Sequence, residues 1–186
     1  MNEAHKHCGS DEWRQRMREV ILPWALRDVQ LGEDVLEVGP GYGAATDLLG
    51  RALPQLTSVE IDDELATMLA QRFESVPSVR IVKGDATALD EPDGRFSGAV
   101  CFTMLHHVPT VELQDRLLAE VARVLRPGAP MVASDSLASE RLAAHHVGDT
   151  YNPVDPDTLP ERLRAAGFSR AEVRTGDIGW TFLAHR

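Results

Sequence analysis

Lysine is almost absent from this 186-residue sequence. Only Lys6 and Lys83 occur, the other cations are arginines scattered along the chain, and the net charge is −10. A nucleic-acid backbone would meet net repulsion, so we expect no nucleic-acid partner. No apolar run approaches the roughly 20 residues of a membrane span, and residues 1–10 contain no apolar signal core. We therefore expect no membrane partner and a cytoplasmic protein.

Cysteine is equally scarce. Cys8 and Cys101 form neither a CxxC pair nor a disulfide framework. Cys101 lies in an apolar stretch, where a small core residue is expected. Metal sites are also poorly supported, because the adjacent side chains of His145 and His146 seldom point the same way. We therefore expect no metal site.

Glycine, by contrast, is concentrated where it has a structural use. Residues 35–43 read Val-Leu-Glu-Val-Gly-Pro-Gly-Tyr-Gly, and a helical pattern follows. This predicts a buried strand, a tight turn and a helix, the opening of a nucleotide-type cofactor site. The Gly39-x-Gly41-x-x-Ala44 spacing satisfies the dinucleotide pattern. S-adenosylmethionine fits as well, because it needs close backbone approach and a ribose-binding acid but no pyrophosphate cradle.

Tyrosine is too rare to support the dinucleotide interpretation. A short-chain dehydrogenase would normally carry a Tyr-x-x-x-Lys pair. The residues four positions after Tyr42 and Tyr151 are Thr46 and Asp155. An NAD(P)-dependent oxidoreductase is therefore the less favoured alternative.

Strands alternate with helices along the chain. We expect strands at residues 34–38, 56–61, 79–82, 96–102, 130–134, 170–174 and 179–184. We expect helices after Ser10, Ala44, Asp62, Thr110 and Thr158, the first interrupted by Pro23 and the last opened by a capping box. This alternation predicts an α/β fold with a doubly wound, mostly parallel sheet. The last two strands are joined by about four residues, which suits a hairpin and an antiparallel last strand.

Five short stretches together resemble the class I S-adenosylmethionine-dependent methyltransferases of the small, single-domain, type 11-like kind. They are residues 35–43, Val59–Asp62, Gly84–Ala86, Leu105–His107 and Leu125–Gly128. The resemblance implies a Rossmann-like, seven-stranded sheet in the order 3-2-1-4-5-7-6. It also implies a cap helix region at residues 1–33, a methyltransferase domain at residues 34–186, and S-adenosylhomocysteine as product.

The same resemblance assigns roles to the glycine turn. Gly39, Gly41 and Gly43 would let the backbone approach the ribose and methionine parts of the cofactor. Glu37 would orient that turn and reach the methionine amino group.

Further cofactor contacts are implied at the ends of the next strands. Glu60 would accept both ribose hydroxyls, and Ile61 would pack on the adenine face. Asp85 would accept from the adenine amino group, with the Ala86 N–H facing a ring nitrogen. The backbone at Phe102 and Thr103 would border the methionine end.

Histidines are the candidates for catalysis. Methyl transfer from a sulfonium needs alignment of the acceptor and, for a hydroxyl or a protonated amine, a general base. His106 and His107 follow the fourth predicted strand, at the sheet edge where ligands of open parallel sheets bind. Either could serve as a base or orient the acceptor.

The irregular segment 135–155 is the expected substrate lid. It carries His145, His146 and Tyr151, which we take as candidate acceptor-binding residues. Without a basic tail or a nucleobase-methylation pattern, a small-molecule acceptor is favoured. A non-catalytic sensor or partner protein that holds S-adenosylmethionine remains the alternative.

Overall fold

A computed structural model describes residues 3–186, with side chains from Lys6 onward, so residues 1–2 of the predicted cap region lie outside the described chain. The strands are β1 (Asp34–Val38), β2 (Gln55–Glu60), β3 (Val79–Lys83), β4 (Gly98–Phe102), β5 (Pro130–Asp135), β6 (Arg170–Gly176) and β7 (Gly179–His185). The α-helices are α1 (Asp11–Arg16), α2 (Leu22–Ala25), α3 (Thr46–Ala52), α4 (Asp63–Arg72), α5 (Val111–Val124), α6 (Glu140–His145) and α7 (Leu159–Ala165). Shorter helical segments are η1 (Glu3–Gly9), η2 (Met17–Ile21), η3 (Leu105–His107) and η4 (Pro156–Thr158).

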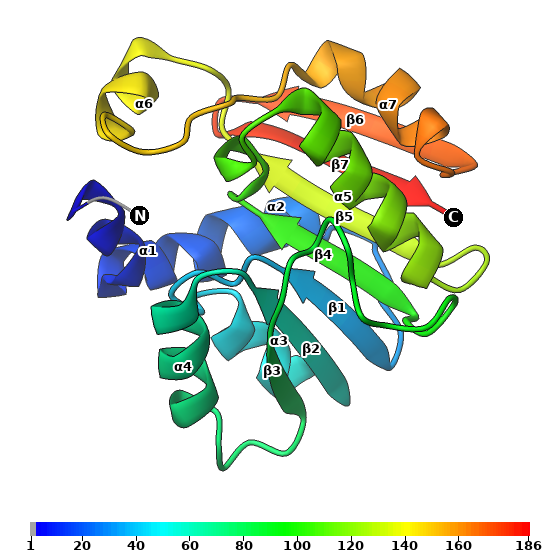
Figure 1. The fold of residues 1–186 in the computed structure, drawn as a ribbon. Helices are drawn as coiled ribbons and strands as arrows, with labels where there is room; N and C mark the ends of the chain where they lie inside the picture. Colours follow the sequence, from blue (N-terminus) through cyan, green and yellow to red (C-terminus); the bar gives the residue numbers. More distant parts are fainter. Residues whose placement is uncertain (1–2) are drawn as a thin grey trace.

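All seven strands form one sheet in the order β3-β2-β1-β4-β5-β7-β6 (Figure 1). The five strands from β3 to β5 are parallel, and β7 runs antiparallel to both β5 and β6. Gly176 pairs with Gly179 across the hairpin, so two residues make the turn. The predicted doubly wound, Rossmann-like sheet with an antiparallel last strand is therefore confirmed.

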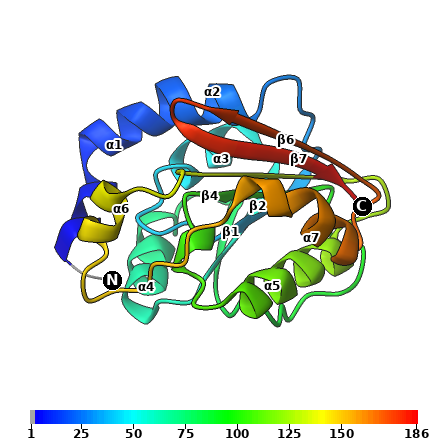
Figure 2. The same ribbon diagram turned by 90° about the horizontal axis from the view of Figure 1, so that it is seen from above.

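Side chains alternate between two hydrophobic clusters, one on each face of the sheet. Along β4, Ala99 and Cys101 belong to the cluster that contains α5 and α7, whereas Val100 and Phe102 belong to the other. That second cluster contains α3 and the N-terminal helices. Viewed from above, the N-terminal helices and α3 lie on one side of the sheet, and α5 and α7 lie on the other (Figure 2).

The N-terminal helices are distorted just before Pro23. The N–H of Leu22 bonds to the carbonyl of Met17, five residues back, so η2 is a π-helical turn. Proline lacks the N–H that an α-helical ladder needs, and such disruptions widen or kink helices locally. The predicted interruption at Pro23 is thus present as a π turn. Met17, Ile21 and Ala25 pack into the core beside β1.

Most predicted helix starts are confirmed. The side chains of Ser10, Asp62 and Thr110 each accept a backbone N–H from the first turn of their helix. The capping box predicted at Thr158 is wrong, because its hydroxyl donates to the carbonyl of Asp155 instead. The short helix η4 begins directly after Asp155, whose side chain caps it by accepting the N–H of Asp157.

One edge of the sheet gathers the segments that matter for function. Strands β4 and β5 point toward the end of the molecule at which both α1 and α6 lie (Figures 1 and 2). The predicted cap region and the segment after β5 are therefore both found at the carboxyl edge of the sheet. None of the helices in the described part of the chain combines the length and apolar character that a membrane span requires.

Substituting alanine for Leu118 tests the core beneath α5. The Leu118 side chain is fully buried, so its removal leaves a cavity and should lower the free energy of unfolding by about 2–5 kcal/mol. Urea unfolding measures the change. Arg116→Ala, an exposed position on the same helix, is the control and should change stability by less than about 0.5 kcal/mol. Equal effects of the two substitutions would contradict the assigned core.

Candidate active site

The turn after β1 has the left-handed backbone that glycine favours. Gly39 and Gly41 have φ angles of +65° and +56°. A Cβ at Gly39 would lie 2.3 Å from Cγ of Met104, whereas a Cβ at Gly41 would meet no atom within 4 Å. Gly39 is therefore required by packing, and Gly41 faces open space. Gly43 also has a positive φ but lies behind the turn, where its Cβ would meet Leu69.

Glu60, the last residue of β2, ties the turn to the neighbouring strand. One carboxylate oxygen accepts the N–H of Gly41 at 3.0 Å, and the other accepts the N–H of Asp62 at 3.0 Å. The side chain is only 5% exposed. Burial raises the pKa of Glu60, and the two backbone N–H bonds partly oppose that rise. The carboxylate thus sits at the mouth of the turn in a fixed orientation.

Glu37 on β1 lies deeper beneath the same turn. The hydroxyls of Ser58 and Thr46 both donate to its Oε2, at 2.6 and 2.8 Å. These bonds join β1, β2 and the first turn of α3. Burial raises the pKa of Glu37 to about 7, and the two hydroxyl bonds oppose that rise.

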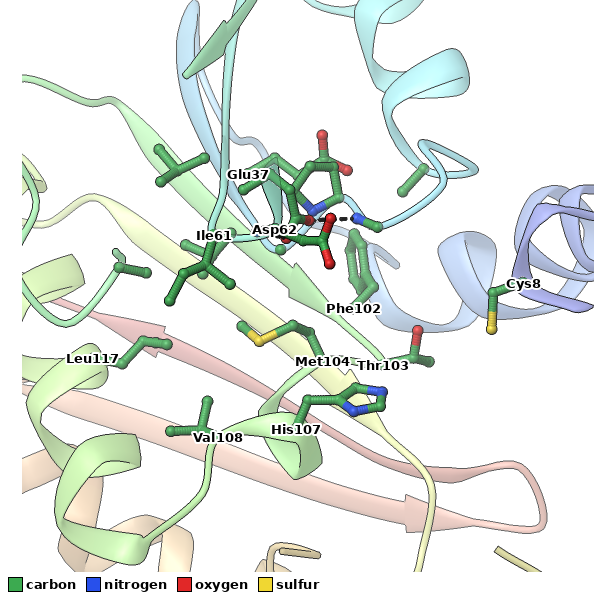
Figure 3. Close-up of a pocket in the computed structure, with 18 of the residues that line it drawn as sticks. Cys8, Glu37, Ile61, Asp62, Phe102, Thr103, Met104, His107, Val108 and Leu117 are labelled. Carbon is green, nitrogen blue, oxygen red and sulfur yellow. Dashed lines mark hydrogen bonds between the residues drawn. The ribbon is translucent and has the colours of Figure 1, made fainter. Parts of the chain in front are cut away.

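A cavity of about 440 Å³ begins at the turn and extends past the end of β4. Of the predicted cofactor residues, those in its wall are Glu37, Gly39, Gly41, Glu60, Ile61, Asp85, Ala86, Phe102 and Thr103. Gly43 is outside the wall. In the view of Figure 3, Ile61 and Asp62 lie on one side and His107 and Val108 on the other, with Met104 between them.

The wall beside β2 and β3 combines an exposed apolar side chain with an exposed acid. Ile61 is apolar yet 67% exposed, an arrangement that leaves a flat hydrophobic face open. Asp85 is exposed, and its Oδ1 accepts the N–H of Thr87 at 2.8 Å, which holds the loop after β3 in a tight turn.

The loop after β4 presents two histidines in different ways. His107 lines the cavity, whereas His106 turns toward β5. Nδ1 of His106 lies 2.7 and 2.8 Å from the two carboxylate oxygens of Asp135, which is 4% exposed. The backbone N–H of His106 also donates to Asp135 at 3.1 Å. Thr103 at the start of this loop has a positive φ of 52°, rare for a residue with a branched side chain.

The segment after β5 folds back over η3. His146 is buried and stacks on Tyr151 with ring centroids 4.6 Å apart, whereas His145 is exposed. None of these three lines the cavity. The neighbouring Asp149 and Thr150 do, so the segment contributes to the wall through other residues.

Several residues of the site escaped the sequence analysis. Asp135 was assigned only as the start of an irregular segment, although an acid ending β5 next to histidines after β4 was a usable signal. Trp13 and Met17 of the N-terminal helices, and Leu113 and Leu117 of α5, also line the cavity. Apolar residues at helical spacing indicate a packed face, and this pattern does not distinguish a cavity wall from the core.

Comparison with known proteins decides the family. The model of a family described as "Methyltransferase domain" matches residues 36–133, more than half of the chain. The chain belongs to this family. The match covers the turn, the ends of the strands on either side of it, and the loop with both histidines. The cofactor of this domain is S-adenosylmethionine, as the resemblance implies.

Individual relatives differ in what they act on. The "O-methyltransferase cnsE" of Penicillium expansum is 30% identical over 90% of this chain and 66% of its own length. The "Ribosomal RNA small subunit methyltransferase A" of Geobacter sulfurreducens is 45% identical over 74 residues, which are 39% of this chain and 27% of that protein. The chain thus spans between about a quarter and two thirds of these two relatives.

A solved structure with S-adenosylmethionine bound has the same fold. It is phosphoethanolamine N-methyltransferase 2 of Haemonchus contortus, with a TM-score of 0.76 and 15% identity. The superposition covers 98% of this chain and 55% of the other. At this identity the likeness concerns the fold alone, so the roles of individual residues in the methyltransferase stay predictions.

The raised pKa of Glu37 predicts how stability depends on pH. Between the ordinary value of 4.5 and about 7, the folded chain keeps a proton that the unfolded chain releases. The free energy of unfolding therefore falls as pH rises through this window, by up to about 3 kcal/mol, and levels off above it. Glu37→Gln should abolish this component.

Urea unfolding of both proteins at pH 5, 6, 7 and 8 measures the component as the difference between the two curves. Glutamine keeps an oxygen that can accept from Ser58 and Thr46, so the substitution removes chiefly the ionisation. A difference that stays constant with pH would show that the pKa of Glu37 is ordinary.

Proposed function

We propose that the chain transfers the methyl group of S-adenosylmethionine to a small-molecule acceptor. One observation carries this proposal, namely the single cavity that joins the glycine turn to His107 and α5. Its volume of about 440 Å³ falls in the range of roughly 300–1,000 Å³ typical of small-molecule sites. Cofactor and acceptor would therefore share one enclosed space.

The residues around the turn fit the cofactor. Gly41 faces open space, so its backbone can approach a ligand closely. Two backbone N–H groups orient the Glu60 carboxylate, whose remaining lone pairs can accept the two ribose hydroxyls. Ile61 offers an exposed apolar face for adenine, and Asp85 lies beside it in the wall. Both hydroxyls that bond Glu37 use Oε2, which leaves Oε1 to accept from the methionine amino group.

Methyl transfer requires little of the protein beyond alignment of the acceptor with the methyl group. The sulfonium of S-adenosylmethionine supplies an already activated methyl group, and the residues of the cavity orient the acceptor and exclude water. His107 lines the cavity, and in this proposal it would accept a proton from a hydroxyl or an amine. His106 stands behind it, held by Asp135.

Two observations favour a small acceptor over ribosomal RNA. The match to the fungal O-methyltransferase extends over 90% of the chain, whereas the matches to two ribosomal RNA enzymes extend over 39% and 76% of it. The net charge of −10 also opposes binding to a phosphate backbone. The alternative of a non-catalytic S-adenosylmethionine-binding protein differs in one outcome, because it would bind the cofactor and label no product.

Transfer of a tritiated methyl group discriminates these functions. The purified chain with methyl-tritiated S-adenosylmethionine should label the small-molecule fraction of a metabolite extract. Purified ribosomal RNA in a parallel reaction should stay unlabelled. Label in the RNA alone would overturn the small-acceptor proposal. Tight cofactor binding with no labelled product in any fraction would favour the non-catalytic alternative.

Substitution of Glu60 tests the cofactor assignment separately. Glu60→Ala removes the acceptor for the ribose hydroxyls and should weaken S-adenosylmethionine binding by about 1–3 kcal/mol, or about 5- to 150-fold. Isothermal titration calorimetry measures the affinity. The control Glu64→Ala removes an exposed carboxylate from the first turn of α4 and should leave affinity unchanged. Unchanged affinity in Glu60→Ala would show that the ribose binds elsewhere.

A further inference from the structure

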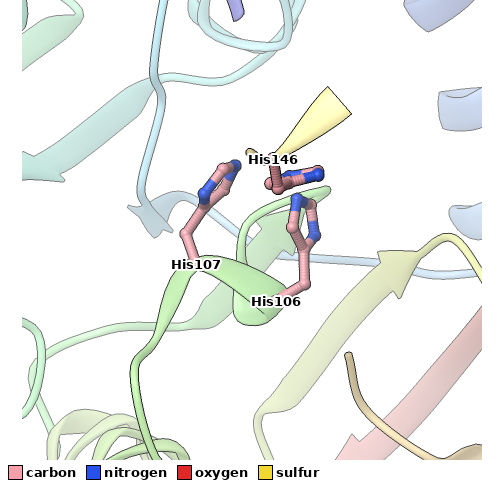
Figure 4. A group of neighbouring side chains, drawn as sticks. All are labelled: His106, His107 and His146. Carbon is pink, nitrogen blue, oxygen red and sulfur yellow. The ribbon is translucent and has the colours of Figure 1, made fainter. Parts of the chain in front are cut away.

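Three histidines from two separate segments converge beside the cavity. His106 and His107 belong to η3, and His146 directly follows α6. One ring nitrogen of each lies within 4.8 Å of the corresponding nitrogens of the other two. The ring centroids are 4.1, 4.9 and 5.1 Å apart, and Figure 4 shows the three rings gathered together.

Specific bonds hold the two segments together. The N–H of Asn152 donates to the carbonyl of His106 at 2.8 Å, and its side-chain amide donates to the carbonyl of Val108 at 3.0 Å. The buried side chain of Gln114 donates to the carbonyls of Leu105 and Asn152. The segment after α6 is therefore fastened to η3, and His146 reaches the other two histidines as a consequence of that attachment.

Hydrogen-bond partners outside the cluster also orient two of the three rings. Nδ1 of His106 faces the Asp135 carboxylate, and Nδ1 of His146 lies 2.7 Å from the carbonyl of Leu142. Both partners are acceptors, so each Nδ1 carries the hydrogen and the lone pair of the neutral ring is on Nε2. Support of this kind, from a carboxylate or a carbonyl, is what metal-binding histidines receive from their surroundings. Tyr151 stacks on His146 and further restricts that ring.

We propose that His106, His107 and His146 bind a divalent transition-metal ion, with Zn²⁺ as the best match. Neutral imidazoles suit this class of ion, and three protein ligands with one open position are typical of catalytic zinc sites. Tetrahedral zinc holds its nitrogen ligands roughly 3.3 Å apart. The three histidine nitrogens lie within 4.8 Å of one another, so each pair must approach by about 1.5 Å at most. Small changes of side-chain torsion achieve this. The site departs from the sequence expectation of no metal, which did not consider a cluster of histidines from two separate segments.

The position of the cluster gives the ion a use. His107 is both a member of the cluster and part of the cavity wall. The open coordination position would therefore face the acceptor and bind an oxygen, nitrogen or sulfur atom of it, and a coordinated His107 would hold the ion instead of accepting the proton. This use rests on the proposed methyl transfer, whereas binding of the ion itself does not.

Zinc titration of the chain tests the proposal. The protein carries no histidine tag and is first freed of metal with a chelator. Competition with a chromogenic zinc chelator should give one ion per chain, and Co²⁺ should give the intense visible absorption of a tetrahedral site. His107→Gln and His146→Gln should each weaken zinc binding at least about 10-fold. Asp135→Asn, which alters the support of His106, should weaken it about 10- to 100-fold.

Matched controls separate ligation from other effects. His145→Gln changes the exposed neighbour of His146 and should leave zinc affinity unchanged. The double variant His7→Gln, Cys8→Ser removes the other histidine- and cysteine-containing segment and should also bind one ion. Calorimetry with S-adenosylhomocysteine and urea unfolding check that each variant is folded.

Three results would overturn the proposal. They are no stoichiometric zinc binding, binding that survives the ligand substitutions in folded protein, and binding that disappears in the His7/Cys8 double variant. Because the readout is metal binding and not methyl transfer, failure here leaves the proposed function standing. Failure of the methyl-transfer assay likewise leaves the metal site testable.

Discussion

The parallel register of the central strands is the constraint on which the site depends. Parallel strands end at the same edge, so residues that follow different strands are brought together without direct sequence proximity. Glu37 pairs with Ser58 across β1 and β2, and their side chains bond. Phe102 pairs with Ser134 across β4 and β5. Just beyond that pair, His106 on the loop after β4 contacts the carboxylate of Asp135 at the end of β5.

Two carboxylates are buried beneath the glycine turn, at a cost in folding free energy. Burial raises the pKa of both Glu37 and Glu60, so each opposes folding in its charged form. Hydroxyl and backbone N–H groups offset part of this cost and fix the direction of each carboxylate. Stability alone would be better served by apolar residues here, whereas recognition of hydroxyl and amino groups needs acceptors that are already oriented.

The sequence sufficed for the fold and for the cavity wall around the glycine turn, but not for the histidine cluster beside the cavity. The glycine turn, Glu60 and the terminal hairpin have local patterns whose physical meaning does not depend on distant contacts. The cluster around His146 depends on how a segment with no periodicity returns to η3, which no local pattern encodes. The same limit explains the wrong prediction at Thr158. The local sequence fits a capping box, but in the structure a 3₁₀ turn capped by Asp155 comes first and the Thr158 hydroxyl bonds within it.

The packing of Met104 against Gly39 connects the glycine turn with the loop after β4. Met104 occupies the space that a side chain at position 39 would fill, and it immediately precedes η3. The turn and the loop that carries His106 and His107 are therefore packed against each other through Met104. A ligand that fixes the turn would also narrow the range of positions open to both histidines.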